Sequence, residues 1–209
     1  MATVSQIYQH HGVLLQLQFH MLRVAGVAEL ILQNWSGPPV DRNPIIRVLL
    51  LHDIGNLVKM PSDPSESSLT ARVRAEYQAQ YGNDDHVVSL AIARGLGLSD
   101  GELSLMEGKV FVKNPETAQS NDYARKIGAY ADQRVAPDGV VSLESRLQEA
   151  QTRYRNKPGS SMNNARTEEF IRLAGEIEEQ VMCYCALSPQ DITEEVVAPL
   201  VEWLSGFEI

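Results

Sequence analysis

Apolar residues recur every three or four positions through most of the chain, which is the period of an α-helix and not of a β-strand. The first helix is predicted over 4–35, with Gly12 as a candidate kink. Further helices are predicted at about 45–55, 69–81, 83–97, 117–135, 142–154, 165–186 and 189–204, with a short one that begins at 99. No segment shows sustained strand alternation. The predicted fold class is therefore all-α, a helical bundle of about eight to ten helices.

Pro, Gly and Ser mark the breaks between these helices. The stretch with the strongest linker composition is 156–164, which contains Pro158-Gly159-Ser160-Ser161. We therefore expect residues 1–155 to form the main helical domain. Residues 156–209 are expected to form a C-terminal helical extension that packs on the same bundle, covers a pocket or mediates dimerisation, so a homodimer is a candidate assembly.

Composition places the chain among ordinary globular proteins. Of its 209 residues, 44% are hydrophobic and 22% are charged, so it is long enough to bury a core without disulfides or a structural metal. With 18 Lys and Arg against 27 Asp and Glu, the net charge is −9, which disfavours a nucleic-acid partner. The two cysteines, Cys183 and Cys185, lie too close together in the sequence to join distant segments by a disulfide. We expect a cytoplasmic protein with no membrane partner, because 1–8 lacks the features of a signal peptide.

One polar pair stands out in an apolar helix. His52 and Asp53 directly follow Leu49, Leu50 and Leu51. Burying both side chains is costly unless another group pairs with them. The pair could therefore bind an ion, or His52 could be a core histidine that donates to a carbonyl while Asp53 caps a nearby element.

Two more polar residues face inward on their own predicted helices. His20 shares a helix face with Val24 and Val27, and Asp132 lies at the edge of the apolar stripe of 117–135. Two neutral imidazoles and one or two carboxylates are a ligand set suited to a divalent first-row metal. The candidate metal ligands are therefore His20, His52, Asp53 and Asp132.

At these four positions the chain resembles the HD superfamily of metal-dependent phosphohydrolases, whose signature is a histidine, a His-Asp pair and a distant aspartate. The resemblance covers about 13–135. It implies one divalent metal ion (Mn, Co, Ni, Fe, Zn or Mg) held by His20, His52, Asp53 and Asp132. It also implies that Asp53 has a catalytic role, orienting a water that attacks a phosphoester.

The chain departs from the family pattern after the His-Asp pair. Many members continue with Ile-Gly-Lys, whereas here Asn56 stands at the lysine position and Lys59 follows three residues later. Lys59, Arg23 and Arg134 are the candidate substrate-binding residues, because a cation can neutralise a phosphate. For the two arginines an ion pair within the protein is the alternative interpretation.

His86 is the remaining candidate catalytic residue. In the family this region often lines the substrate pocket, so His86 could donate to a leaving oxygen. The alternative is a half-exposed histidine stabilised by Asp84 and Asp85 at a helix start.

The expected function is hydrolysis of a nucleotide or another small phosphoester by metal-activated water, with a small phosphorylated metabolite as partner. Two alternatives remain open at this point. The chain could be a metal- or ligand-binding signalling module with little turnover, or a helical interaction protein in which the four residues form a buried polar network.

Overall fold

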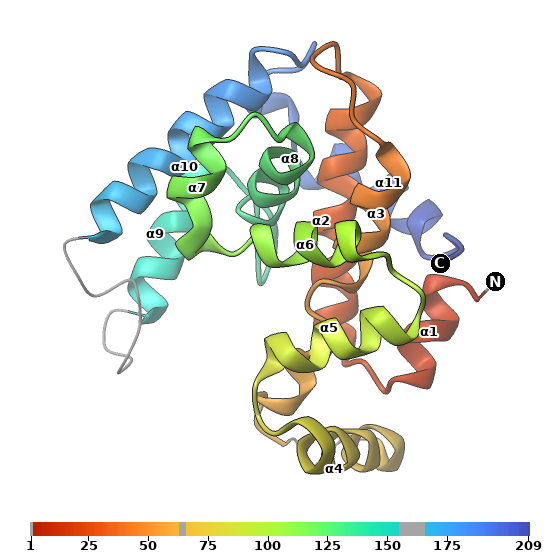
Figure 1. Cartoon of the computed structure of the whole chain (residues 1–209). Coiled ribbons are helices and arrows are strands. Elements are labelled where there is room, and N and C mark those ends of the chain that lie inside the picture. The colour runs from red at the N-terminus through yellow and green to blue at the C-terminus, as the bar shows by residue number, and fades with distance from the viewer. Residues whose placement is uncertain (1, 63–65, 155–165) are drawn as a thin grey trace.

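The computed structural model describes residues 2–62, 66–154 and 166–209, and it confirms the all-α class (Figure 1). Eleven α-helices lie in these ranges, slightly more than the eight to ten expected. They are α1 (Val4–His10), α2 (Leu15–Gln33), α3 (Arg42–Leu51), α4 (Ser68–Tyr81), α5 (Asp85–Gly95), α6 (Asp100–Gly108), α7 (Asn114–Gln119), α8 (Tyr123–Asp132), α9 (Leu143–Tyr154), α10 (Arg166–Met182) and α11 (Glu194–Leu204). Short 3-10 helices are η1 (Ile54–Val58), η2 (Phe111–Lys113) and η4 (Pro189–Asp191). The linker predicted at 156–164 lies outside the described residues.

Helix α2 is the central element of the bundle. Helices α3, α8 and α11 pack against it, and most of its residues from Leu17 to Ile31 are buried. By length and composition α2 could cross a membrane, but 61% of the relevant window is buried inside the protein. A buried core helix passes the same test, so α2 is accounted for by its place in the bundle.

The predicted first helix is two helices rather than one kinked helix. The chain breaks between α1 and α2 at Gly12, whose φ of +59° is a left-handed conformation that glycine adopts without strain. A Cβ at this position would lie 3.0 Å from the Cα of Thr70 in α4. The break therefore depends on close packing with a helix far along the chain.

The helix predicted over 117–135 was also wrong in its extent. It is divided into α7 and α8, and Asp122 begins α8 by accepting a hydrogen bond from the backbone N–H of Arg125. After α8 the chain forms a two-stranded hairpin, β1 (Val135–Ala136) with β2 (Gly139–Val140), joined by a turn at Pro137-Asp138. The hairpin begins three residues after Asp132, so it holds the end of α8 in place.

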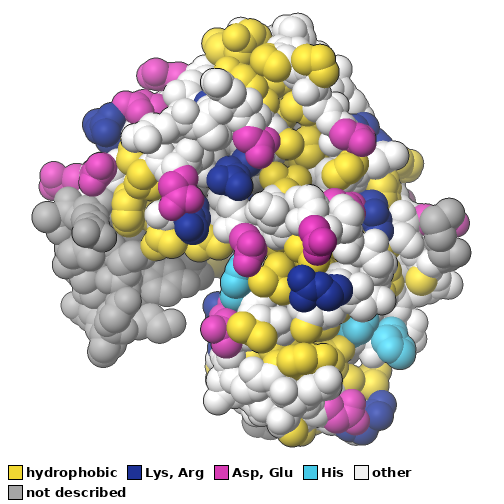
Figure 2. Space-filling view, viewed as in Figure 1, with side chains coloured by type: hydrophobic (Ala, Val, Ile, Leu, Met, Phe, Trp, Pro, Cys, Tyr) yellow, Lys and Arg dark blue, Asp and Glu magenta, His cyan; other side chains and the backbone are white. Residues whose placement is uncertain are grey.

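The C-terminal helices complete the bundle. Helix α11 packs along α2, and α10 packs against α7 and α8 (Figure 1). Backbone bridges join Thr3 to Glu208 and Trp35 to Cys185, which ties the end of the chain to the N-terminal helices. Acidic and basic side chains are interspersed over much of the face drawn in Figure 2.

Candidate metal centre

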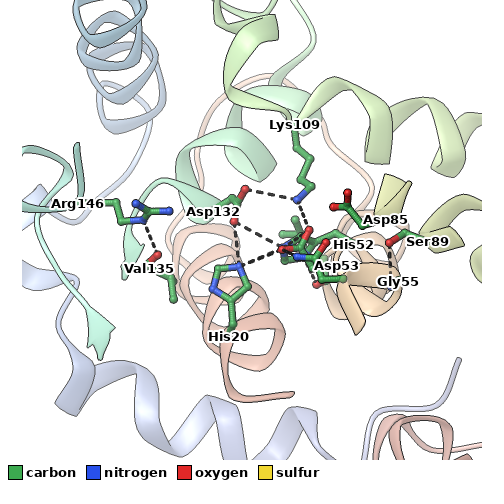
Figure 3. Close-up of polar contacts among 12 residues, drawn as sticks. His20, His52, Asp53, Gly55, Asp85, Ser89, Lys109, Asp132, Val135 and Arg146 are labelled. Atoms are coloured by element: carbon green, nitrogen blue, oxygen red, sulfur yellow. Dashed lines mark hydrogen bonds and ion pairs between the residues drawn. The ribbon is translucent and has the colours of Figure 1, made fainter. Parts of the chain in front are cut away.

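His20, His52, Asp53 and Asp132 converge on one point although they come from separate elements (Figure 3). The two Nε2 atoms lie 3.3 Å apart. Oδ1 of Asp132 lies 3.3 Å from Nε2 of His20 and 3.5 Å from Nε2 of His52. Asp53 is 3.7 Å from each imidazole, through Oδ2 to His20 and Oδ1 to His52. The predicted juxtaposition of these four side chains is confirmed.

The end of α3 explains how two adjacent side chains reach one point. The helix ends at Leu51, and the backbone leaves helical geometry at Asp53, where φ is −119° and ψ is 15°. Nδ1 of His52 donates to the carbonyl of Leu49 at 2.6 Å, because a carbonyl can only accept. The neutral imidazole therefore carries its proton on Nδ1 and has a lone pair on Nε2, which is directed at the cluster. A histidine that ligates a metal through Nε2 needs this tautomer.

His20 and Asp132 come from α2 and α8, which precede and follow this turn in the sequence. His20 lies in the first half of α2, and Asp132 is the last residue of α8, which packs against α2. The side chain of His52 is fully buried, whereas those of Asp53 and Asp132 are each 23% exposed and that of His20 is 20% exposed. One side of the cluster is therefore closed by the core and the other is accessible to solvent.

Lys109 belongs to this cluster, and sequence reasoning missed it. Its side chain is 9% exposed, and Nζ lies 3.0 Å from Oδ1 of Asp53 and 3.5 Å from Oδ2 of Asp132 (Figure 3). Burial favours the neutral carboxylic acids, but Lys109 and the two imidazoles outweigh it. The pKa of Asp53 and that of Asp132 both lie well below their usual range. Burial would lower the pKa of Lys109, but the two aspartates raise it, so all three groups are charged near neutral pH.

Asn56 orients one of the carboxylates. Its Nδ2 donates to Oδ2 of Asp53 at 2.7 Å. The position at which the resembled family has a lysine is therefore used here to hold Asp53. Next to it, Gly55 lies so close to α5 that a Cβ would be 2.5 Å from the backbone N of Ser89, and its own N–H donates to Oγ of Ser89 at 2.9 Å. Only glycine allows this approach of the two segments.

The three candidate substrate-binding cations are engaged elsewhere. Arg23 forms an ion pair with Glu194 of α11 at 2.8 Å, and Lys59 forms one with Asp85 while its side chain remains 52% exposed. Arg134 is almost fully buried. Its guanidinium donates to the hydroxyl of Tyr130 and to the carbonyls of Val141, Pro189 and Ile192. Arg134 therefore faces the protein interior and not a ligand, because the C-terminal segment covers it.

His86 lies outside the cluster. It is half-buried near the start of α5 and lines a cavity of about 310 Å³ with Ser104, Glu107, Lys113 and Arg125, among others. Its backbone N–H donates to Asp84, and within the described residues no hydrogen bond or ion pair joins its side chain to the four clustered residues. The structure thus brings together the four predicted ligands and adds Lys109 and Asn56. It places His86 in a cavity whose lining includes Gly108 and Val110, the chain neighbours of Lys109, but none of the four ligands.

No family model, no curated protein and no solved structure matches this chain.

Proposed function

We propose that this protein is a metal-dependent phosphohydrolase that acts on a nucleotide or another small phosphoester. The observation that carries the proposal is the convergence of His20, His52, Asp53 and Asp132 from three separate parts of the bundle. Each residue alone has an ordinary structural explanation. Four such explanations give no reason for the side chains to meet at one point.

The donor set fits one divalent ion. One ligand atom from each of His20, His52 and Asp53 lies within 4.8 Å of the others, and Asp132 adds an oxygen in contact with both imidazoles. Two imidazole nitrogens and carboxylate oxygens suit Mn²⁺, Fe²⁺, Co²⁺, Ni²⁺ or Zn²⁺, and the carboxylates also suit Mg²⁺. The hydrogen bond from His52 to Leu49 and that from Asn56 to Asp53 are the supporting contacts that such ligands need.

A bound ion would lower the pKa of water and neutralise charge as phosphorus is attacked. The protein's own groups have complementary tasks. Asp53 is ionised and fixed by Asn56, so it can accept a hydrogen bond from the attacking water and orient it. The partial exposure of His20, Asp53 and Asp132 gives a substrate access to the cluster from solvent.

The test begins with metal content. Wild-type protein purified without chelator is analysed by mass spectrometry of its metals and titrated with Mn²⁺, Co²⁺, Ni²⁺ and Mg²⁺. Each metal-loaded form is then assayed with p-nitrophenyl phosphate, bis(p-nitrophenyl) phosphate and a panel of nucleotides. His20→Ala should lose both metal and turnover, and the matched control His10→Ala, an exposed histidine at the end of α1, should keep both.

Three outcomes separate the hypotheses. Metal binding with turnover supports the phosphohydrolase. Stoichiometric metal binding without hydrolysis of any ester would replace it by a binding or signalling module. If the wild-type protein carries no metal as purified and binds none of the four added ions, the cluster is a buried polar network and the proposal is contradicted.

A further inference from the structure

We propose that Lys109 is the residue that binds the substrate's phosphoryl group at this centre, an inference that rests on the proposed function. Lys109 is distant in the sequence from position 56, where the resembled family has a lysine shortly after the His-Asp pair. It comes directly after α6, from an element that provides none of the four candidate ligands. In Figure 3 its side chain reaches the carboxylates from the side opposite His20.

The hydrogen-bonding capacity of the ammonium group leaves room for a ligand. An ammonium group has three N–H donors. Asp53 and Asp132 accept two of them, at 3.0 Å and 3.5 Å. Among the described residues the third has no acceptor, so it can donate to an oxygen that approaches the carboxylates. A phosphoryl group must lie there to meet a water oriented by Asp53.

Charge at the site supports the same assignment. With neutral imidazoles, the two carboxylates and the ammonium group that contacts them carry −1, −1 and +1, which sum to −1. Adding a divalent ion makes the loaded site +1, whereas without the lysine it would be neutral. In a chain of net charge −9, this local positive charge is what attracts a phosphoester anion to the site.

The other positions from which a cation could reach the site are less available for this task. Asn56 occupies the lysine position of the resembled family and is bonded to Asp53. Lys59 points to Asp85, and Arg23 points to Glu194. Among these candidates, Lys109 is the cation whose charged atom contacts the carboxylates of the cluster.

The experiment measures two affinities on the full chain. Isothermal titration calorimetry gives the affinity for Mn²⁺ and then the affinity of the manganese-loaded protein for inorganic phosphate. Lys109→Met should bind Mn²⁺ at least as tightly as wild type, because a competing cation has been removed. It should bind phosphate about tenfold or more weakly, the change expected for loss of one charge-assisted hydrogen bond.

Two further variants control the interpretation. Lys109→Arg keeps a cationic donor and should retain more phosphate affinity than Lys109→Met. Lys126→Met removes another buried lysine, one that donates to Gln180 on α10, and should change neither affinity. If Lys109→Met does not fold, Lys109→Gln, which keeps a donor for the carboxylates without the charge, is measured in its place.

The two possible failures are distinguishable. If the wild-type protein binds no manganese, or no phosphate once loaded, the proposed function fails and this inference fails with it. If the wild-type protein binds both and the Lys109 variants bind phosphate as tightly as it does, the role of Lys109 alone is overturned. A parallel loss of manganese and phosphate affinity would also overturn it, because Lys109 would then only hold the cluster together.

Discussion

Asn56 holds Asp53 through a hydrogen bond of 2.7 Å from its Nδ2 to Oδ2, across three residues of the turn that follows α3. The partner and the ligand are thus encoded in one short segment, Asp53-Ile54-Gly55-Asn56. The other carboxylate oxygen, Oδ1, contacts His52 and Lys109. Both oxygens of Asp53 therefore have assigned partners within the cluster.

Asn56→Ala should weaken metal binding without removing a ligand. A group that orients a ligand typically contributes about 10- to 100-fold to metal affinity, so we expect a loss of that size for Mn²⁺. Titration calorimetry measures it, with Asn43→Ala, an exposed asparagine in α3, as the control. An affinity equal to that of wild type would mean that Asp53 does not bind the ion through this geometry.

Asp53→Ala tests whether the metal serves function or folding. Because the core is extensive and does not include this side chain, helical circular dichroism should remain largely intact while metal binding and any phosphatase activity are lost. Asp85→Ala, which removes a neighbouring carboxylate outside the predicted ligand set, is the matched control. Wholesale loss of helicity in Asp53→Ala would assign the site a structural role instead.

Lys109→Met should lower the stability of the metal-free protein. The variant leaves two partly buried carboxylates without their cation, and since each is 23% exposed, solvent reduces the cost to about 1–3 kcal/mol, less than for a fully buried pair. Urea unfolding in EDTA measures the difference at pH 7, and Lys126→Met is the control. Added Mn²⁺ should restore much of the loss, because the ion supplies the missing positive charge.

The pH dependence of this difference follows from the depressed pKa values of Asp53 and Asp132. A carboxyl group with a lower pKa in the folded state stabilises the fold above its ordinary pKa of about 3.9, and this contribution is lost as the pH falls toward the folded value. In EDTA, the contribution of the two aspartates to the stability gap between wild type and Lys109→Met should therefore be present at pH 7. The gap should be smaller below about pH 4 than at pH 7, and a gap that widens on acidification would contradict this account.

The site residues that could be predicted are those whose inward direction follows from the spacing of apolar residues in their own helix. His20 and Asp132 lie on or beside the apolar face of their own helices, so their inward direction follows from spacing. Lys109 offers no such signal. It follows Gly108 at the end of a short helix, and its partners Asp53 and Asp132 are 56 and 23 residues away, so its burial is decided by tertiary packing alone.

The two errors in the predicted helices have different causes. The separation of α1 from α2 depends on the contact between Gly12 and Thr70, which local sequence does not reveal. The separation of α7 from α8 did have a local signal. Ser120-Asn121-Asp122 is a run of turn and capping residues, although the apolar spacing on both sides of it predicts one continuous helix.

Arg134 should prove to be a stabilising residue rather than a substrate-binding one. Its guanidinium satisfies one hydroxyl and three backbone carbonyls in the interior, which joins α8 to the hairpin and to the segment around η4. Arg134→Met leaves those acceptors without a donor and should cost about 3 kcal/mol or more of unfolding free energy. The folded variant should bind metal as tightly as wild type. A selective loss of phosphate affinity at unchanged stability would instead show that Arg134 binds the substrate.

His86→Ala decides whether the cavity beside α5 takes part in the reaction. A general acid or base typically contributes about 10²-fold or more to turnover, and it must reach the reacting atoms. Since the side chain of His86 lines a cavity that includes none of the four candidate ligands, we expect metal content at the wild-type level and a change in turnover of less than about threefold. Metal analysis and steady-state assays of the manganese-loaded variant measure both quantities. A fall of about 10²-fold at full metal content would place the leaving group of the substrate in this cavity, and loss of metal would make His86 a ligand.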